Sequence, residues 1–228
     1  MDQGEALTPS GLRTPRAAAV AGILFSLLLG VALALIRLSV PADPAGPDAW
    51  LDDPGRRGAV SVALNLVPFA GIAFLWFIGV VRDRIGRSED RFFATVYLGS
   101  GLLFVAMLFA AAAVAGGMLT DPALEAGQTP SAEIWGLERR ITFALLNLYA
   151  IRMGAVFILS TATIALRTRI IPRWLVVSGY IVAALLLLGV NVSPWATLLL
   201  PAWVLAVSVD LLLTSVRAGR GDPERAAP

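Results

Sequence analysis

The sequence predicts an all-α fold, a polytopic transmembrane bundle of six helices with both ends of the chain in the cytoplasm. The first observation behind this prediction is composition: 57% of the 228 residues are apolar and 15% are charged, far from the mixture in a soluble domain. The second is that six apolar stretches are long enough to cross a hydrocarbon core of about 30 Å. The third is that arginine collects in alternate connections between those stretches.

Missing residue types exclude several classes of function. The chain has no cysteine and no histidine, which rules out disulfides, thiol nucleophiles, imidazole bases and the usual Cys/His zinc sites. All 18 basic residues are arginine, a usage that, with abundant Ala, Gly and Val, is typical of a bacterium with a GC-rich genome. There is also no phosphate-binding Gly-Lys-Ser/Thr loop. We therefore expect no metal, no cofactor and no nucleic-acid partner.

The chain begins with a polar, turn-rich segment, residues 1–16, for which we expect a disordered cytoplasmic tail. Residues 17–36 follow as twenty apolar residues, enough at about 1.5 Å per residue to cross the membrane. A signal peptide is the alternative because Arg13 and Arg16 precede this stretch, but the stretch is longer than a typical h-region and no convincing cleavage site follows. Small residues recur every four positions along it, which favours close packing inside the bundle over a dimer face.

Polar segments rich in Pro, Gly, Asp and Arg separate the later spans. Pro68 should kink the second span, and Trp135, in the polar loop 119–140, is expected at the membrane interface. The six predicted spans cover residues 17–36, 59–81, 92–118, 141–166, 174–190 and 194–215, which together form one transmembrane domain, 17–215. A second disordered cytoplasmic tail is expected over residues 216–228.

The distribution of arginine predicts the orientation. Twelve arginines lie in the two tails and the connections 82–91 and 167–173, five lie in the other connections, and the eighteenth is Arg152. Acidic residues are split almost evenly, seven against eight, so the asymmetry belongs to arginine. Because cytoplasmic loops carry the excess of arginine, we expect both ends in the cytoplasm and a location in the cell inner (plasma) membrane.

The candidate polar site centres on Arg152, close to the middle of the fourth span. An arginine there costs about 2.5 to 3.5 kcal/mol on insertion scales, so it must face protein or water. It could contact an anion or substrate, or form half of a charge pair that moves; the alternatives are a static structural pair and a side chain that snorkels to the headgroups. Asp210 is the obvious partner, roughly 10 Å nearer the cytoplasm along the helix axis, and Arg217 is the rival partner of Asp210.

Other polar residues could complete this site. Tyr149 lies one turn from Arg152 on nearly the same helix face, whereas Asn147 lies about 140° away. Asn65 in the second span could join the same polar interior, or it could bond across helices as ordinary packing. The candidate site therefore comprises Arg152, Asp210, Tyr149 and Asn65, with no catalytic residue assigned.

The basic turn Arg167-Thr-Arg-Ile-Ile-Pro-Arg-Trp-Leu175, followed by Gly179 and a Leu-rich span, resembles a turn in a family of small bacterial six-helix membrane proteins with no assigned activity. The layout of polar loops, basic turns and six spans is similar along most of the chain. Where some of those proteins carry an Arg and a Glu together in the third helix, this chain has Gly99-Ser-Gly101 and no acid. The resemblance implies a six-span membrane fold and no particular activity.

Two functions from different classes fit the sequence. The first is a non-enzymatic integral membrane protein, a structural or partner subunit of a membrane assembly or a homo-oligomer, whose polar residues hold the bundle together. The alternative is a small permease whose route passes Arg152 and Asp210. A membrane enzyme is third, because without His or Cys its catalysis would depend on loop residues that form no recognisable constellation. The lipid bilayer is the expected partner in every case.

Overall fold

The computed structural model describes residues 14–40, 53–85, 91–120, 132–169, 171–188 and 193–220. Within these ranges the chain is helical and contains no strand, which confirms the all-α prediction. The predicted tails 1–13 and 221–228, and most of the loops, lie outside the described residues. The helices are α1 (Thr14–Ser39), α2 (Pro54–Ile85), α3 (Arg91–Leu119), α5 (Ala132–Phe143), the π-helix η2 (Ala144–Ala150), α6 (Ile151–Thr168), α7 (Arg173–Leu188), the 3-10 helix η3 (Pro194–Leu198) and α8 (Leu199–Arg220).

Five helical segments are long and apolar enough to cross a membrane: 16–39, 54–82, 92–119, 133–168 and 195–217. The continuous segment 133–168 comprises α5, η2 and α6. The remaining predicted span, the fifth (174–190), corresponds to α7, an apolar helix of only 16 residues. At about 1.5 Å per residue α7 is roughly 24 Å long, somewhat shorter than a typical hydrocarbon core.

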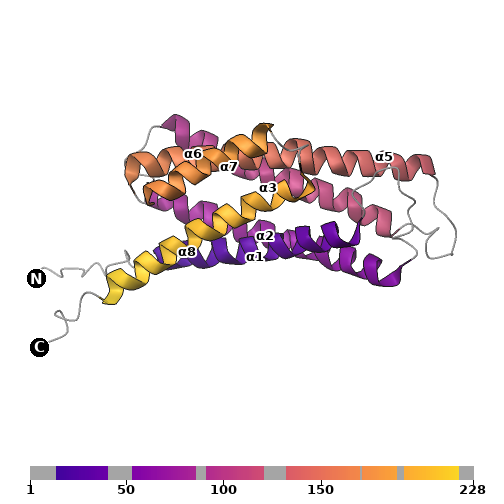
Figure 1. The fold of residues 1–228 in the computed structure, drawn as a ribbon, viewed down its shortest axis with the longest axis horizontal. Helices are drawn as coiled ribbons and strands as arrows, with labels where there is room; N and C mark the ends of the chain where they lie inside the picture. Colours follow the sequence, from indigo (N-terminus) through magenta and orange to yellow (C-terminus); the bar gives the residue numbers. More distant parts are fainter. Residues whose placement is uncertain are drawn as a thin grey trace, which may run out of the picture.

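The helices form an elongated bundle in which neighbours run along the long axis (Figure 1). The main contacts follow the order α1, α2, α3, α6, α7, α8 and back to α1, so these six helices close into a ring. The tail end of the bundle is the end at which α1 begins, α8 ends and α6 turns into α7; the loop end is the opposite end, where α5 begins (Figure 1). The α7 helix is tied to both neighbours, because the Tyr180 hydroxyl lies 3.0 Å from that of Thr163 and the Trp203 indole N–H donates to the Leu175 carbonyl over 3.2 Å.

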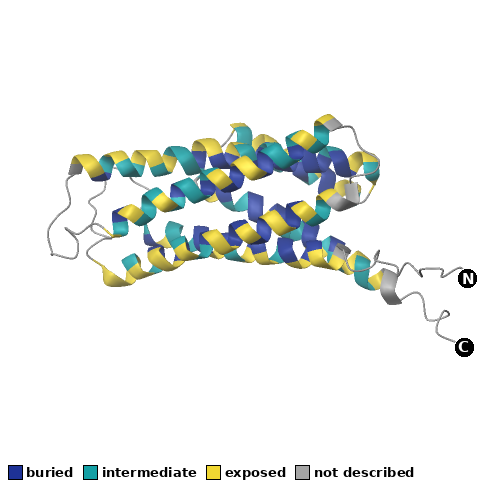
Figure 2. Cartoon of the chain, turned by 180° about the vertical axis from the view of Figure 1, so that it is seen from behind, coloured by how far each residue is buried: buried dark blue, intermediate teal, exposed yellow. Residues whose placement is uncertain are grey.

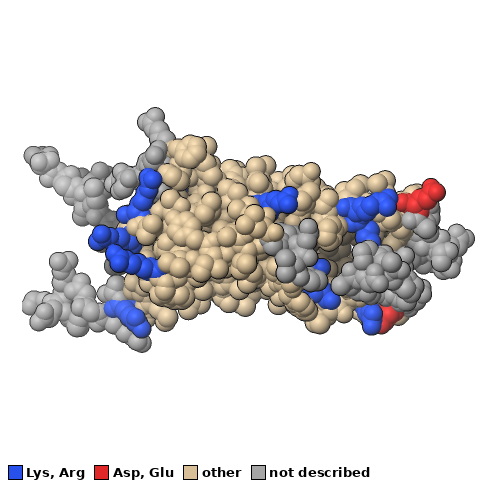
Figure 3. Space-filling model, turned by 45° about the horizontal axis from the view of Figure 1, so that its top comes forward, with Lys and Arg blue, Asp and Glu red and all other residues tan. Residues whose placement is uncertain are grey.

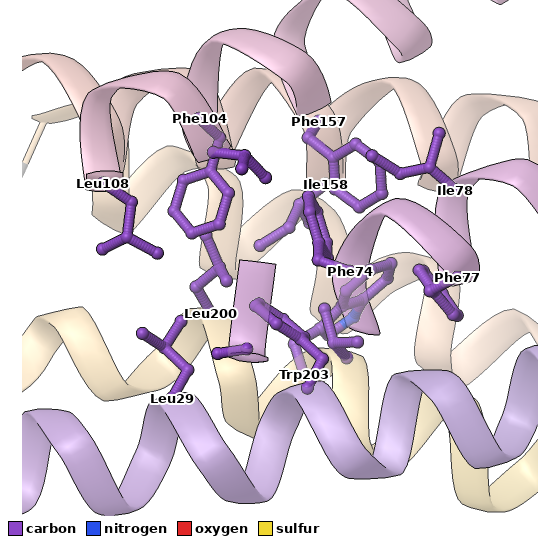
Figure 4. Close-up of a cluster of buried hydrophobic side chains, with 14 of the residues drawn as sticks. Leu29, Phe74, Phe77, Ile78, Phe104, Leu108, Phe157, Ile158, Leu200 and Trp203 are labelled. Atoms are coloured by element: carbon purple, nitrogen blue, oxygen red, sulfur yellow. The ribbon is translucent and has the colours of Figure 1, made fainter. Parts of the chain in front are cut away.

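Aromatic side chains fill the middle of the bundle (Figure 4). Phe74 lies between three other rings, with centroid distances of 4.4 Å to Phe25, 5.3 Å to Phe104 and 4.8 Å to Phe157. Tyr97 contacts Phe157 at 4.9 Å. These five side chains come from four different helices and are at most 1% exposed, so they form a closed layer across the bundle.

Burial is concentrated in the half of the molecule nearer the tail end, whereas the helices at the loop end are mostly half-buried or exposed (Figure 2). The small-residue stripe of α1 contributes to the first half, since Ala18, Gly22 and Ser26 are buried. A Cβ atom on Gly22 would collide with the Ser208 hydroxyl of α8 and the Phe77 ring of α2. The stripe therefore packs inside the bundle, as the sequence favoured.

Several helix ends differ from the sequence prediction. The α2 helix begins earlier, at Pro54, because the Asp53 carboxylate caps it by accepting from the backbone N–H groups of Gly55 (2.8 Å) and Arg56 (3.4 Å). Residues 132–140, predicted as loop, form most of α5, and α8 continues to Arg220, inside the predicted tail 216–228. Both extensions are polar; outside the hydrocarbon core a helix tolerates charged residues that a membrane span does not.

Trp135 lies in the α5 extension. It is 5% exposed and packs in a small cluster with Val60 of α2 and Met118 of α3. Its indole ring is therefore held inside the bundle, and its position at a membrane interface stays a prediction.

Candidate functional site

The predicted polar residues do not converge in the structure. Arg152 is exposed on the surface of α6, and Tyr149, in η2, is 53% exposed. Asn65 is exposed on α2, where its side-chain amide donates to the Ser61 carbonyl one turn earlier (2.8 Å). Asp210 on α8 is half-buried. Arg152 and Tyr149 are thus neighbours on one continuous helical segment, whereas Asn65 lies on α2 and Asp210 on α8.

Arg152 and Asp210 also lie at different heights. Leu200 of α8 packs against Gly154 of α6, which aligns these two helices along the bundle. Arg152 precedes Gly154 by two residues and Asp210 follows Leu200 by ten, so the two charges are separated by about 18 Å along the axis. Among the described residues no ion pair joins Arg152 to Asp210. The axial separation of Arg152 and Asp210 is larger than the roughly 10 Å expected from the sequence. Counting residues from the predicted end of each span does not give the register between α6 and α8.

A cavity of about 410 Å³ lies in the loop-end half, between α1, α2, α3 and the α5–η2 segment. Its wall is mostly aliphatic, with Leu33, Leu64 and Ala111 among its members. No described residue of α7, η3 or α8 lines it. The cavity thus lies where four helices continue beyond the region that α7 and α8 cover.

The aromatic layer closes the cavity towards the tail end. Leu29 and Leu108 line the cavity. Leu29 lies one helical turn after Phe25 in α1, and Leu108 lies one helical turn after Phe104 in α3. Figure 4 shows Leu29 and Leu108 beside the aromatic side chains. A second, much smaller hollow of about 40 Å³, lined by residues that include Phe77 and Thr161, lies on the other side of this layer.

One edge of the large cavity is polar. The Arg37 guanidinium, part-buried at the end of α1, donates from Nη2 to Oδ1 of Asn147 over 3.3 Å. Asn147 is 6% exposed, and its own amide nitrogen donates to the Phe143 carbonyl (3.2 Å), which fixes the direction of the acceptor. The pair therefore links α1 to η2 across the cavity.

The π-helix η2 contains this asparagine. Residues 144–150 adopt i→i+5 geometry between two α-helical segments, and Asn147 and Ala150 are its buried residues. Single π turns inside α-helices are found frequently at functional sites, because the extra residue redirects side chains of the surrounding turns. Here the π segment directs an amide inward and leaves Tyr149 on the outer surface.

Three more polar residues line the same edge: Arg139, Arg140 and Thr142. The Thr142 hydroxyl is buried and has no hydrogen-bond partner within the part of the chain that the structure describes. The described lining includes no aspartate or glutamate. The edge therefore combines three guanidinium groups with an amide and a hydroxyl in an otherwise apolar hollow.

The height of this polar edge follows from residue counts. Arg37 follows Arg16 by 21 residues in α1, and Asn147 precedes Arg167 by 20. Both intervals correspond to about 30 Å, the thickness of a hydrocarbon core. With the tail-end arginines at one headgroup layer, Arg37 and Asn147 lie at the other. Arg152 is five residues from Asn147, so its long side chain can reach that second layer from the lipid-facing surface.

Sequence reasoning missed this site. The sequence prediction places Arg37, Arg139 and Arg140 in polar loops. It places Asn147 on a different face of the fourth span from Arg152. The sequence contained one signal for this pair. Arg37 and Asn147 each lie about 20 helical residues, one membrane thickness, from an arginine at the tail end of the bundle. Which face of each helix turns inward was not available from the sequence.

Fold and site together define an all-helical protein whose helices are compatible with a multi-pass membrane location, with a one-ended apolar cavity edged by arginine. No protein-family model, no curated protein and no solved structure matches the chain.

Proposed function

We propose that this chain is a non-enzymatic multi-pass protein of the bacterial inner (plasma) membrane that acts by binding a ligand or a membrane partner at the cavity. The observation that carries the proposal is the shape of the cavity, which is open to a polar edge at the loop end and blocked by the aromatic layer towards the tail end. Such a pocket favours binding over passage. Its size lies within the range of about 300 to 1,000 Å³ that is usual for small-molecule sites.

The orientation proposed is the one that arginine counting predicts, with the tail end in the cytoplasm. Supporting this, the six tail-end arginines whose side chains the structure describes are exposed: Arg16, Arg82, Arg167, Arg169, Arg173 and Arg217. Figure 3 shows charged side chains gathered at both ends of the molecule, with acidic atoms visible only among those at one end. Asp53 caps α2, and Glu133 and Glu138 lie in α5, so these three acids are at the loop end, whereas Asp210 lies in α8.

The chemistry of the lining supports binding rather than catalysis. Arginine, asparagine and threonine can hold an anion through charged and neutral donors. A general acid or base usually needs a group that titrates near neutral pH, and the described lining supplies none.

The alternative function remains a small permease, but its substrate would follow a different path through the bundle from the one expected past Arg152 and Asp210. The separation of Arg152 from Asp210 removes support from a path through those residues. The small hollow beyond the aromatic layer favours a path through the centre of the bundle, which would require the rings around Phe74 to move apart. The two functions differ in whether the cavity is ever open to the tail end.

Thiol labelling distinguishes these functions, because the chain has no cysteine of its own. Ala115→Cys places a thiol in the cavity, Arg169→Cys places one on the exposed tail end, and Ala202→Cys places one on an exposed, lipid-facing position of α8. In sealed vesicles of known orientation, a membrane-impermeant reagent on the cytoplasmic side should label Arg169→Cys and leave the other two unreacted. Labelling of Ala115→Cys from that side would contradict the binding function and favour the permease.

A further inference from the structure

The cavity has two chemically different parts. Its wall, between α1, α2 and α3, is built from Leu, Ala, Val and Met side chains, and its edge carries three arginines, Asn147 and Thr142. A small hydrophilic anion would use the edge and leave the apolar wall unfilled. An uncharged hydrocarbon would fill the wall and bring no counter-charge to Arg37. An amphiphile with an anionic head satisfies both parts.

Within the described part of the chain, no acidic side chain pairs with Arg37. Its guanidinium is part-buried and contacts the neutral amide of Asn147. Arg56 forms an ion pair with Asp53, outside the cavity. A guanidinium offers five N–H donors in a planar fork that matches phosphate oxygens, and one of the donors at Arg37 is committed to Asn147. The others can bind an anion.

Thr142 supplies a second, independent observation. Thr142 lines the cavity, and its hydroxyl oxygen is buried without a hydrogen-bond partner in the described part of the chain. A buried hydroxyl without a hydrogen bond is unfavourable. A ligand oxygen would satisfy it if the Thr142 side chain rotated towards the cavity.

The height of the edge agrees with a lipid ligand. Arg37 and Asn147 lie at the headgroup layer on the loop-end side, about 30 Å from the tail-end arginines. The apolar wall extends from there towards the middle of the bilayer, in the direction in which an acyl chain runs from its headgroup.

We infer that the cavity is a binding site for an anionic phospholipid of the loop-end leaflet, with its phosphate held by Arg37 and Arg140 and one acyl chain lying along the wall of α1, α2 and α3. The inference requires that the helices span a bilayer. It does not depend on which side is cytoplasmic or on whether the protein also transports, so it can fail separately from the proposed function.

The test is lipid binding to the purified full-length chain in a neutral detergent, measured by native mass spectrometry. Dioleoyl phosphatidylglycerol is titrated against dioleoyl phosphatidylcholine, which has the same acyl chains and no net charge. The wild-type chain should bind the anionic lipid at least about tenfold more tightly, the effect expected of one or two charge-assisted hydrogen bonds. Arg37→Gln should remove most of this preference. Arg152→Gln, which changes an exposed arginine outside the cavity lining, should keep it.

Further variants keep the test decisive. If Arg37→Gln fails to fold, Arg140→Gln changes an exposed residue of the same edge and should lower the preference by several-fold. Ala111→Phe fills the apolar wall and should weaken both lipids, with circular dichroism confirming helical content. Equal binding of the two lipids, or a preference that the edge variants leave unchanged, would overturn the inference. Saturable binding of inorganic phosphate that competes with the anionic lipid at similar affinity would overturn it too, because the acyl chain would then contribute nothing.

Discussion

Arg37 is the residue whose position in the structure differs most from the sequence prediction. In the sequence it looks like the first charge of a polar loop, and in the structure it turns back against the bundle and donates to Asn147. Its position one membrane thickness from Arg16 lets the aliphatic stem pack beside the cavity while the guanidinium stays at the headgroup layer. In the proposed membrane placement, the charge therefore lies at the edge of the cavity without the cost of the bilayer centre.

Arg152 shows the opposite outcome. It attracted attention because an arginine in a span is costly, but it is exposed and lies within snorkelling distance of the headgroup layer that Arg37 marks. Of the explanations open to the sequence, snorkelling is the one that this placement favours. An arginine in a predicted membrane span therefore indicates a functional site only when its depth in the membrane and the helix face that carries it are known.

The first prediction concerns Asn147. Asn147→Leu removes the acceptor that holds the Arg37 guanidinium, and we expect a loss of about 1 to 3 kcal/mol of stability, the cost of leaving a part-buried charged donor unpaired. Asn65→Leu is the matched control: Asn65 is exposed and bonds only to its own helix. Thermal unfolding in detergent should show a lower midpoint for the first variant and little change for the second. Equal midpoints for both variants would show that the Arg37–Asn147 bond does not stabilise the bundle.

At the scale of the helices, the contact between α1 and α8 depends on small residues. Gly22 allows the Ser208 hydroxyl and the Phe77 ring to approach the α1 backbone. In lipid, where apolar surface gains little by leaving the solvent, such close approach is a main source of helix association.

This leads to a second prediction. Gly22→Ala should destabilise the bundle by about 1 to 3 kcal/mol, because the added methyl group forces α8 or Phe77 to move. Gly30→Ala lies on the same helix with nothing within 4 Å of its new Cβ atom, and the better helix propensity of alanine should make it neutral or stabilising by about 0.5 to 1 kcal/mol. Denaturation of the two variants by added sodium dodecyl sulfate measures the difference. The account of the α1–α8 contact is wrong if Gly30→Ala proves the more damaging change.

The membrane helices could be predicted well from the sequence, because long apolar runs report lipid contact directly. The α5 helix could not, since its charged residues indicate exposure to water and exposure does not distinguish a helix from a loop. The early start of α2 was readable in principle from Asp53 followed by Pro54, a capping signal that the polar composition of the loop concealed.

The site was harder to predict for a geometric reason. Arg37 and Asn147 are 110 positions apart, and they meet only because of the register between α1 and η2 and because the π segment turns the amide inward. The helical wheel correctly separated Asn147 from Arg152, which lie on buried and exposed surfaces. It could not tell which of the two surfaces faced the bundle interior.

At the scale of the whole molecule, the ring of helices is filled unevenly. The tail-end half contains the aromatic layer and the α7–α8 pair, whereas the loop-end half is four-sided and hollow. This asymmetry gives the protein one face that is closed and rich in arginine and another that carries the cavity. The proposed binding function requires that these faces lie on opposite sides of one bilayer.

The most direct measurement of that claim is a pair of reporter fusions read in living cells. A reporter active only in the cytoplasm and one active only outside it are fused, in separate chains, after Pro228 and after Gly127 in the connection between α3 and α5. We expect the cytoplasmic reporter to be active after Pro228 and the external reporter after Gly127. Activity of the same reporter at both positions would contradict the bilayer-spanning arrangement on which the cavity's position depends.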